Sequence, residues 1–219
     1  MAAQLSGIRV RGPVPTALLW ASGVASRLPA AQGPRFRPEQ GIAADVLFEL
    51  LRARGRANAR EESARLVREA WSAFVRTCTL QPDVSSEWLR GLRSEVAGLG
   101  LVTDSDTEAV AGVLAHLRLE DSFDAVTVSQ EARAYKPDAR IYRAALKALR
   151  APASRTLFVS DSALDLQGAA KLRMAVAWVP RDMLPDLAKP PDETRVLKSV
   201  RDVEPMVKAY TRSGRFSLR

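Results

Sequence analysis

The chain has 219 residues, 47% of them hydrophobic, which is enough for one α/β domain with a buried core. It contains no run of about 18 apolar residues, so the sequence predicts no membrane-spanning helix. The single cysteine, Cys78, excludes an intramolecular disulfide and a cysteine-rich metal site, and we expect it to be a small core residue.

The net charge of +8 comes from the two ends of the chain. Residues 1–38 contain five arginines and residues 211–219 contain three, and neither segment contains an acid. We expect basic tails that can contact RNA or another polyanion, although the interleaved aromatic residues of a nucleic-acid platform are absent. Because residues 1–38 also resemble an organellar transit peptide, a mitochondrial or other organellar location is the alternative to the cytoplasmic one we expect. The sequence leaves the oligomeric state open.

The first part of the chain is irregular and then becomes helical. Residues 1–40 form a basic N-terminal segment with one short apolar run, residues 16–20, which is the candidate for a first buried strand. Apolar residues then recur at helical spacing over residues 41–97, where we expect three helices, the first of which Gly55 stops.

Strands and helices alternate over residues 98–210, and residues 211–219 form the basic C-terminal tail. We predict strands at residues 99–103, 125–128, 156–160 and 175–179. Helices are expected at residues 110–117, 139–149, 164–171 and 203–210. This alternation predicts βαβ units and a parallel sheet. Ligands bind beyond the carboxyl ends of such strands, so the residues that close the strands are the candidate site.

The first strand end of interest carries Thr103, Asp104 and Ser105. A hydroxyl group with neighbouring backbone N–H groups can hold an anionic oxygen at this position. The alternative is that these residues only cap the helix that follows.

Two later segments add charged groups. Lys136 precedes a proline, which favours an extended backbone, and it can neutralise a carboxylate or phosphate near the strand ends. Asp161 and Asp165 lie four residues apart where a strand turns into a helix, so both can bind Mg²⁺ or hold the lysine. The alternatives are an ordinary surface lysine and simple helix capping.

In this order, the three segments resemble the later motifs of the haloacid dehalogenase (HAD) superfamily. The resemblance runs from residue 99 to 181, and the helical residues 41–97 are similar to the family's inserted cap. It implies an α/β fold, a Rossmann-like parallel sheet with a small inserted helical cap. The catalytic candidates that it implies are Thr103, Lys136, Asp161 and Asp165, with Ser160 and Ser162 as further candidates. The binding candidates are Asp104, Ser105 and Tyr142.

The motifs mix two branches of that superfamily. Residues 133–137, and residues 158–160 followed by Asp165, resemble the 2-haloacid dehalogenases, which use no metal. Asp161 suits the phosphatases instead, where this position helps to hold Mg²⁺, and Ser162 stands where the dehalogenases have asparagine. We therefore expect no cofactor, and at most weak Mg²⁺ binding through Asp161 and Asp165.

The family's first motif, a strand that ends in a nucleophilic aspartate, has no counterpart in this sequence. The candidate run at residues 16–20 is followed by Ala21 and Gly23 where acids are expected, and no acid precedes Glu39. Without that aspartate, no aspartyl intermediate can form. We therefore expect a HAD-like protein that is not an ordinary hydrolase, and that binds a small anionic or acyl ligand or catalyses a non-hydrolytic step.

Two alternatives remain open. One is a structural or interaction protein whose basic tails join an RNA-containing or other assembly. The other is an active phosphatase or dehalogenase with an unrecognised nucleophile, which would need a carboxylate other than Asp161 or Asp165 in the site.

Overall fold

The computed structural model describes residues 16–181 and 188–213. The helices are α1 (Thr16–Ala25), α2 (Glu39–Arg52), α3 (Ala59–Thr77), α4 (Ser86–Glu95), α5 (Thr107–Leu117), α6 (Ser129–Ala132), α7 (Ala139–Ala148), α8 (Ala163–Ala170) and α9 (Val203–Ser213). The strands are β1 (Gly100–Thr103), β2 (Ala125–Val128), β3 (Leu157–Ser160), β4 (Ala175–Trp178) and β5 (Arg195–Val196). None of these helices is both long and apolar enough to cross a membrane.

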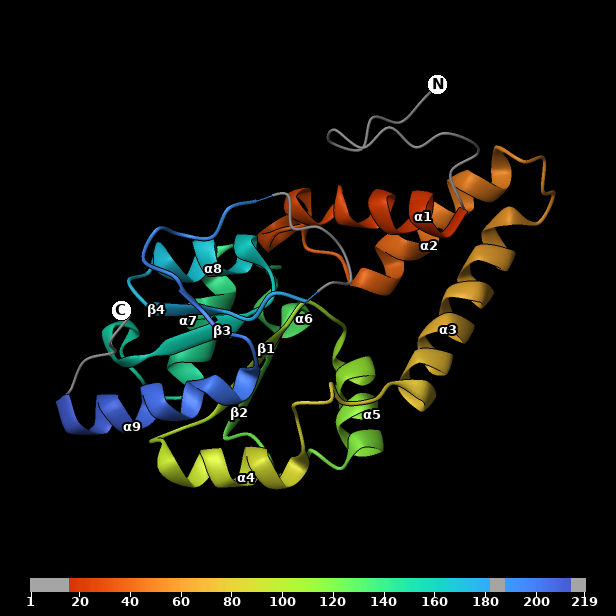
Figure 1. Ribbon diagram of the computed structural model, residues 1–219. Helices are drawn as coiled ribbons and strands as arrows, with labels where there is room; N and C mark the ends of the chain where they lie inside the picture. The colour runs from red at the N-terminus through yellow and green to blue at the C-terminus, as the bar shows by residue number, and fades with distance from the viewer. Residues whose placement is uncertain (1–15, 182–187, 214–219) are drawn as a thin grey trace.

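The strands form two parallel sheets, with the orders β1-β2 and β3-β4-β5 (Figure 1). Gly100 pairs with Ala125 in the first sheet, and Leu157 pairs with Ala175 in the second. Each of the four predicted strands is confirmed to within one residue at either end. The predicted fold class, α/β with parallel strands joined by helices, is therefore confirmed.

The prediction of a buried strand at residues 16–20 is wrong, because these residues lie in helix α1. The indole N–H of Trp20 donates to the carbonyl of Ala43 at 2.8 Å, and Gly23 lies against Val46, so α1 packs on α2. A short apolar run alone does not distinguish a strand from a buried helix, and the alanine and leucine of this run favour a helix. The described residues therefore contain no strand in front of the helical region.

The helical region packs in two directions. Ile42 and Val46 of α2 form a core cluster with Val67 of α3. In contrast, Trp88 and Leu92 of α4 pack against α9 and the second sheet. The predicted boundaries of the cap at residues 41 and 97, and those of the other segments, stay predictions.

The far end of α3 is less buried than the sequence predicts. Val67 is buried, but Phe74, an apolar residue seven positions further along α3, is 59% exposed. Cys78 follows the last turn of α3 and is half-buried rather than part of the core. Half of the eight tail arginines lie outside the described residues, and the polyanion contact stays a prediction.

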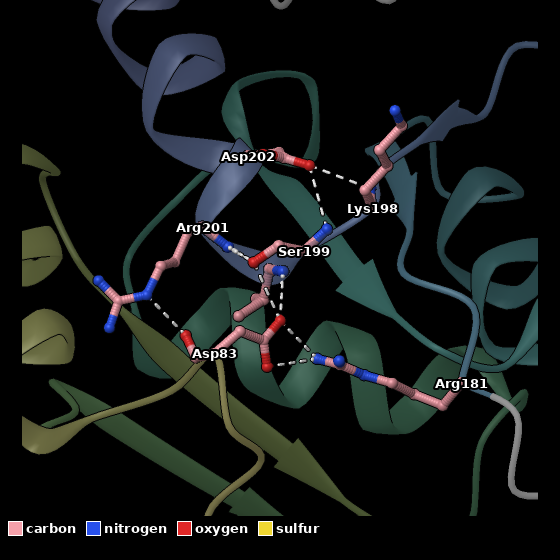
Figure 2. A network of polar contacts seen from close by, with 7 residues as sticks. Asp83, Arg181, Lys198, Ser199, Arg201 and Asp202 are labelled. Atoms are coloured by element: carbon pink, nitrogen blue, oxygen red, sulfur yellow. Dashed lines mark hydrogen bonds and ion pairs between the residues drawn. The ribbon is translucent and has the colours of Figure 1, made fainter.

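Asp83, in the loop between α3 and α4, forms hydrogen bonds to Arg181 and to residues 199–200 in the C-terminal part of the chain (Figure 2). Arg181 donates to both carboxylate oxygens at 3.0 Å, and Ser199 Oγ and the Val200 N–H donate to Oδ2 at 3.0 and 2.9 Å. Arg201 Nε donates to the Asp83 carbonyl at 2.9 Å. Burial acts to raise the pKa of Asp83, but these hydrogen bonds and the Arg181 charge outweigh it and bring the pKa to about 2.

Candidate functional site

Lys136, Asp165 and Ser160 form the hydrogen-bonded centre of the candidate site. Lys136 Nζ lies 2.6 Å from Asp165 Oδ2, and Ser160 Oγ donates to the same oxygen at 3.1 Å. The Lys136 and Asp165 side chains are only 14% and 12% exposed. Ser160 closes β3, and Asp165 lies in the first turn of α8, where the helix dipole stabilises a carboxylate. The structure thus brings together three of the residues that the sequence predicted.

Tyr142 forms a hydrogen bond to the backbone of this centre. Its side chain is fully buried in α7, and its hydroxyl donates to the backbone carbonyl of Asp165 at 2.8 Å. Burial raises the pKa of the Tyr142 hydroxyl. A Cβ atom on Gly168 would lie 2.6 Å from this hydroxyl, so the glycine allows α8 to approach α7. Tyr142, which the sequence predicted as a binding residue, therefore contacts the backbone of the site at Asp165.

Asp104 follows β1 and lies beside the loop that carries Lys136. Its Oδ1 accepts a hydrogen bond from the Lys136 N–H at 2.8 Å. Burial raises the pKa of Asp104 to about 6 although the charge of Lys136 opposes the shift. Lys136 therefore connects the end of β1, through its backbone, with the end of β3, through its side chain and Asp165.

Two further acids, Glu39 and Asp106, lie near Asp104 and were missed in the sequence. The Asp106 carboxylate accepts from the N–H groups of Glu39 and Gln40 at 2.8 and 2.9 Å, and so caps α2 from another element. Burial, followed by the charges of Asp106 and Asp104, raises the pKa of Glu39 to about 7. The sequence gives only one indication of this cluster, which is that Glu39 is the first acidic residue of the chain.

Other predicted residues have structural contacts. The Ser105 carbonyl accepts from Ser129 Oγ at 2.8 Å. Ser162 caps α8, since its Oγ accepts from the Asp165 N–H at 3.4 Å. Thr103 ends β1 and is half-buried.

Asp161 is exposed, and its backbone carbonyl accepts from Trp178 Nε1 at 3.0 Å. Within the described part of the chain, no group of three or more histidine, cysteine, aspartate or glutamate side chains is placed to hold a metal ion. Weak Mg²⁺ binding through Asp161 and Asp165 stays a prediction.

Comparisons with known proteins find similarity to 2-haloacid dehalogenases. The (S)-2-haloacid dehalogenase of Pseudomonas sp. (strain YL) is 30% identical over 115 residues, which are 51% of this chain and 50% of that protein. The chain thus spans about half the length of the curated relatives it matches.

Solved dehalogenase structures share the fold. One dehalogenase crystal structure has a TM-score of 0.69 at 21% identity, and the match covers 86% of this chain and 81% of that one. The L-2-haloacid dehalogenase of Xanthobacter autotrophicus with chloropropionic acid covalently bound has a TM-score of 0.65 at 20% identity, with coverages of 87% and 84%. A family model described as haloacid dehalogenase-like hydrolase matches residues 41–179. Because this match includes more than half of the sequence, the chain belongs to the haloacid dehalogenase-like hydrolase family.

Proposed function

We propose that the protein binds a small organic anion, of the 2-haloacid or 2-hydroxyacid class, at Lys136 and does not hydrolyse it as an ordinary member of the family would. One observation carries this proposal. The Lys136–Asp165–Ser160 centre is complete, whereas residues 1–38 contain no acid that could serve as the nucleophile.

The chemistry of the site suits a carboxylate ligand. An ammonium group has three N–H donors, and Asp165 takes one of those of Lys136. The remaining donors can bind a ligand carboxylate, and we expect the hydroxyl group of Thr103, which ends β1, to add a further donor. Asp104 sets the pH dependence, because its carboxyl group can donate to a ligand oxygen when protonated but repels an anion when ionised. Affinity should therefore decrease as the pH rises through about 6, the pKa of Asp104.

Hydrolysis through a covalent intermediate needs an attacking carboxylate. Loss of a nucleophile lowers the rate by several orders of magnitude. Lys136 and Asp165 neutralise each other at 2.6 Å, so Asp165 is held as the partner of the lysine.

The test measures binding and halide release together, with 2-chloropropionate and lactate as probes at pH 5.5 and 7.5. We expect binding that is tighter at pH 5.5 and no release of chloride. Lys136→Met should weaken binding at least tenfold, whereas Lys136→Arg should keep part of it. Lys147→Met, which removes an exposed lysine of α7, is the matched control and should bind like the parent. Binding of neither probe to the folded parent protein would refute the proposal.

An active hydrolase is the second candidate, because Asp104 places a carboxyl group beside Lys136 at the end of β1. Chloride release that disappears in both Asp104→Asn and Lys136→Met would establish this candidate and exclude the non-hydrolytic one.

A further inference from the structure

A cavity of about 440 Å³ lies at the turn between α2 and α3, and its lining includes Phe48, Arg52, Arg56, Asn58, Arg60 and Glu61. Figure 1 shows this turn at the end of the helical region that points away from the strands. Helix α2 has 14 residues, so its length of about 20 Å separates the cavity from Glu39, which lies near the candidate site. The cavity is therefore distinct from the site at Lys136, and its volume is within the range of about 300–1,000 Å³ found for small-molecule sites.

The turn is a basic patch in a part of the chain that is neutral as a whole. Residues 50–60 contain four arginines and no acid. Three of these arginines, Arg52, Arg56 and Arg60, line the cavity, whereas Glu61 is the one acidic residue among the lining residues. The lining thus has three cations for one carboxylate. Such an excess of cations around a hollow attracts an anionic ligand.

Two of the three guanidinium groups are already held in position. Arg56 donates to both carboxylate oxygens of Glu62, through Nε at 3.1 Å and through Nη2 at 2.8 Å. Arg60 donates to Asp45 at 2.8 Å, and its guanidinium carbon lies 4.0 Å from the centre of the Phe48 ring. A guanidinium group has five N–H donors, so both side chains keep donors for a ligand. Because these contacts orient the groups beforehand, a ligand has little of the site to order when it binds.

Arg52 is the lining arginine whose charge is not balanced. Its side chain is exposed, and no acidic side chain of the described residues forms an ion pair with it. Asn58, the N-cap of α3, forms no side-chain capping hydrogen bond, so the partial positive charge of the helix start adds to that of the arginines. The attraction increases with the charge of the ligand, which favours a dianion over a monovalent carboxylate.

We propose that this cavity binds a small phosphate monoester, whose phosphate group pairs with the three lining arginines. Planar guanidinium groups match phosphate because they can donate two parallel N–H groups to its oxygens. The organic part of the ligand lies against Phe48 and Ala57, which are apolar residues of the same lining. This inference does not depend on the proposed function, because it concerns another site and another class of anion.

The test is calorimetric titration at pH 7.5 and low salt with phenylphosphonate, whose phosphorus–carbon bond is not hydrolysed. We expect it to bind at least tenfold more tightly than benzoate, which has the same ring and a single charge. Arg52→Gln should weaken binding of phenylphosphonate at least fivefold, and Glu61→Gln should strengthen it. Arg68→Gln, which removes an exposed arginine of α3 outside the lining, is the matched control and should bind like the parent. Lys136→Met should also bind phenylphosphonate like the parent.

Four results would overturn the proposal. The first two are no binding of phenylphosphonate to the folded parent protein, and equal binding by the parent and Arg52→Gln. The third is binding that disappears in Lys136→Met but not in Arg52→Gln, which would place the phosphonate at the candidate site. The fourth is displacement of phenylphosphonate by a single-stranded RNA oligonucleotide, which would make the basic patch a nucleic-acid contact. Binding of 2-chloropropionate is measured in the same samples, and its absence from the parent refutes only the proposed function.

Discussion

Replacing Asp83 by asparagine should destabilise the protein, because it removes the carboxylate charge that pairs with Arg181. The substitution keeps the size of the side chain but removes the negative charge that Arg181 contacts at both oxygens, each at 3.0 Å. It also replaces one of these two accepting oxygens by an NH₂ group, which is a donor. The Asp83 and Arg181 side chains are 17% and 23% exposed, so the pair is neither fully buried nor an ordinary surface pair. Charge-assisted hydrogen bonds in such surroundings contribute about 1.5–3 kcal/mol, and we expect a loss of about 2 kcal/mol at pH 7.

The pH dependence provides the sharper measurement. Because the folded pKa of about 2 lies below the usual value of 3.8, the contribution of Asp83 is complete above pH 4 and is lost as the pH falls through about 2. Urea unfolding at pH 7, 5, 3 and 2 should therefore show a difference between parent and Asp83→Asn that is constant to pH 5 and shrinks below pH 4. Asp192→Asn, at an exposed site, is the control and should match the parent. A difference below 0.5 kcal/mol at pH 7 (roughly the effect of an ordinary surface substitution), or one that persists at pH 2, would refute the assignment.

Three other substitutions, with Gly91→Ala as a control for the first, test the residues that pack around the site and the neighbouring acid Glu39. Gly168→Ala should lower the free energy of unfolding by about 1–3 kcal/mol in urea, because its Cβ would meet Tyr142 Oη at 2.6 Å. Gly91→Ala, with no atom within 4 Å of its added Cβ, should be neutral or slightly stabilising. Tyr142→Phe should cost about 1 kcal/mol by the same measurement, since it removes the donor to the Asp165 carbonyl. The folded pKa of Glu39, about 7, exceeds its usual value of 4.5, so the parent loses stability as the pH rises between these values. In unfolding measured from pH 4 to 8, Glu39→Gln should then be more stable than the parent by roughly 1–2 kcal/mol at pH 8 and equal to it at pH 4.

The strands were predictable because buried parallel strands are short apolar runs with polar residues at their carboxyl ends. Residues 125–128, for example, were predicted with the bounds that the structure shows. Lys136, Asp165 and Ser160 were expected to meet near the carboxyl ends of parallel strands, and they do so although β2 and β3 belong to different sheets.

The errors have physical causes. Residues 17–20 are all apolar, so nothing in their periodicity separates a strand from a helix, and Leu18 stays exposed in the helix that forms. Phe74 follows the apolar period of α3, yet α3 runs past the elements that cover its first half, and the side chain stays exposed. The contact between Glu39 and Asp106 joins residues 67 positions apart and depends on burial, which a local pattern does not encode.

The loop that carries Tyr135 and Lys136 contacts three parts of the molecule, so a change in this loop affects all three. The backbone N–H of Lys136 binds Asp104, and its side chain binds Asp165, so the loop connects both sheets. The adjacent Tyr135 is fully buried; its N–H binds the Gln32 side chain at 3.0 Å, and its hydroxyl donates to the Arg37 carbonyl at 2.7 Å. The segment between α1 and α2 therefore docks on the same loop that presents the cation. A ligand that binds Lys136 only in the folded protein stabilises the folded state, so its binding should also stabilise the contact between the helical region and the sheets at this junction.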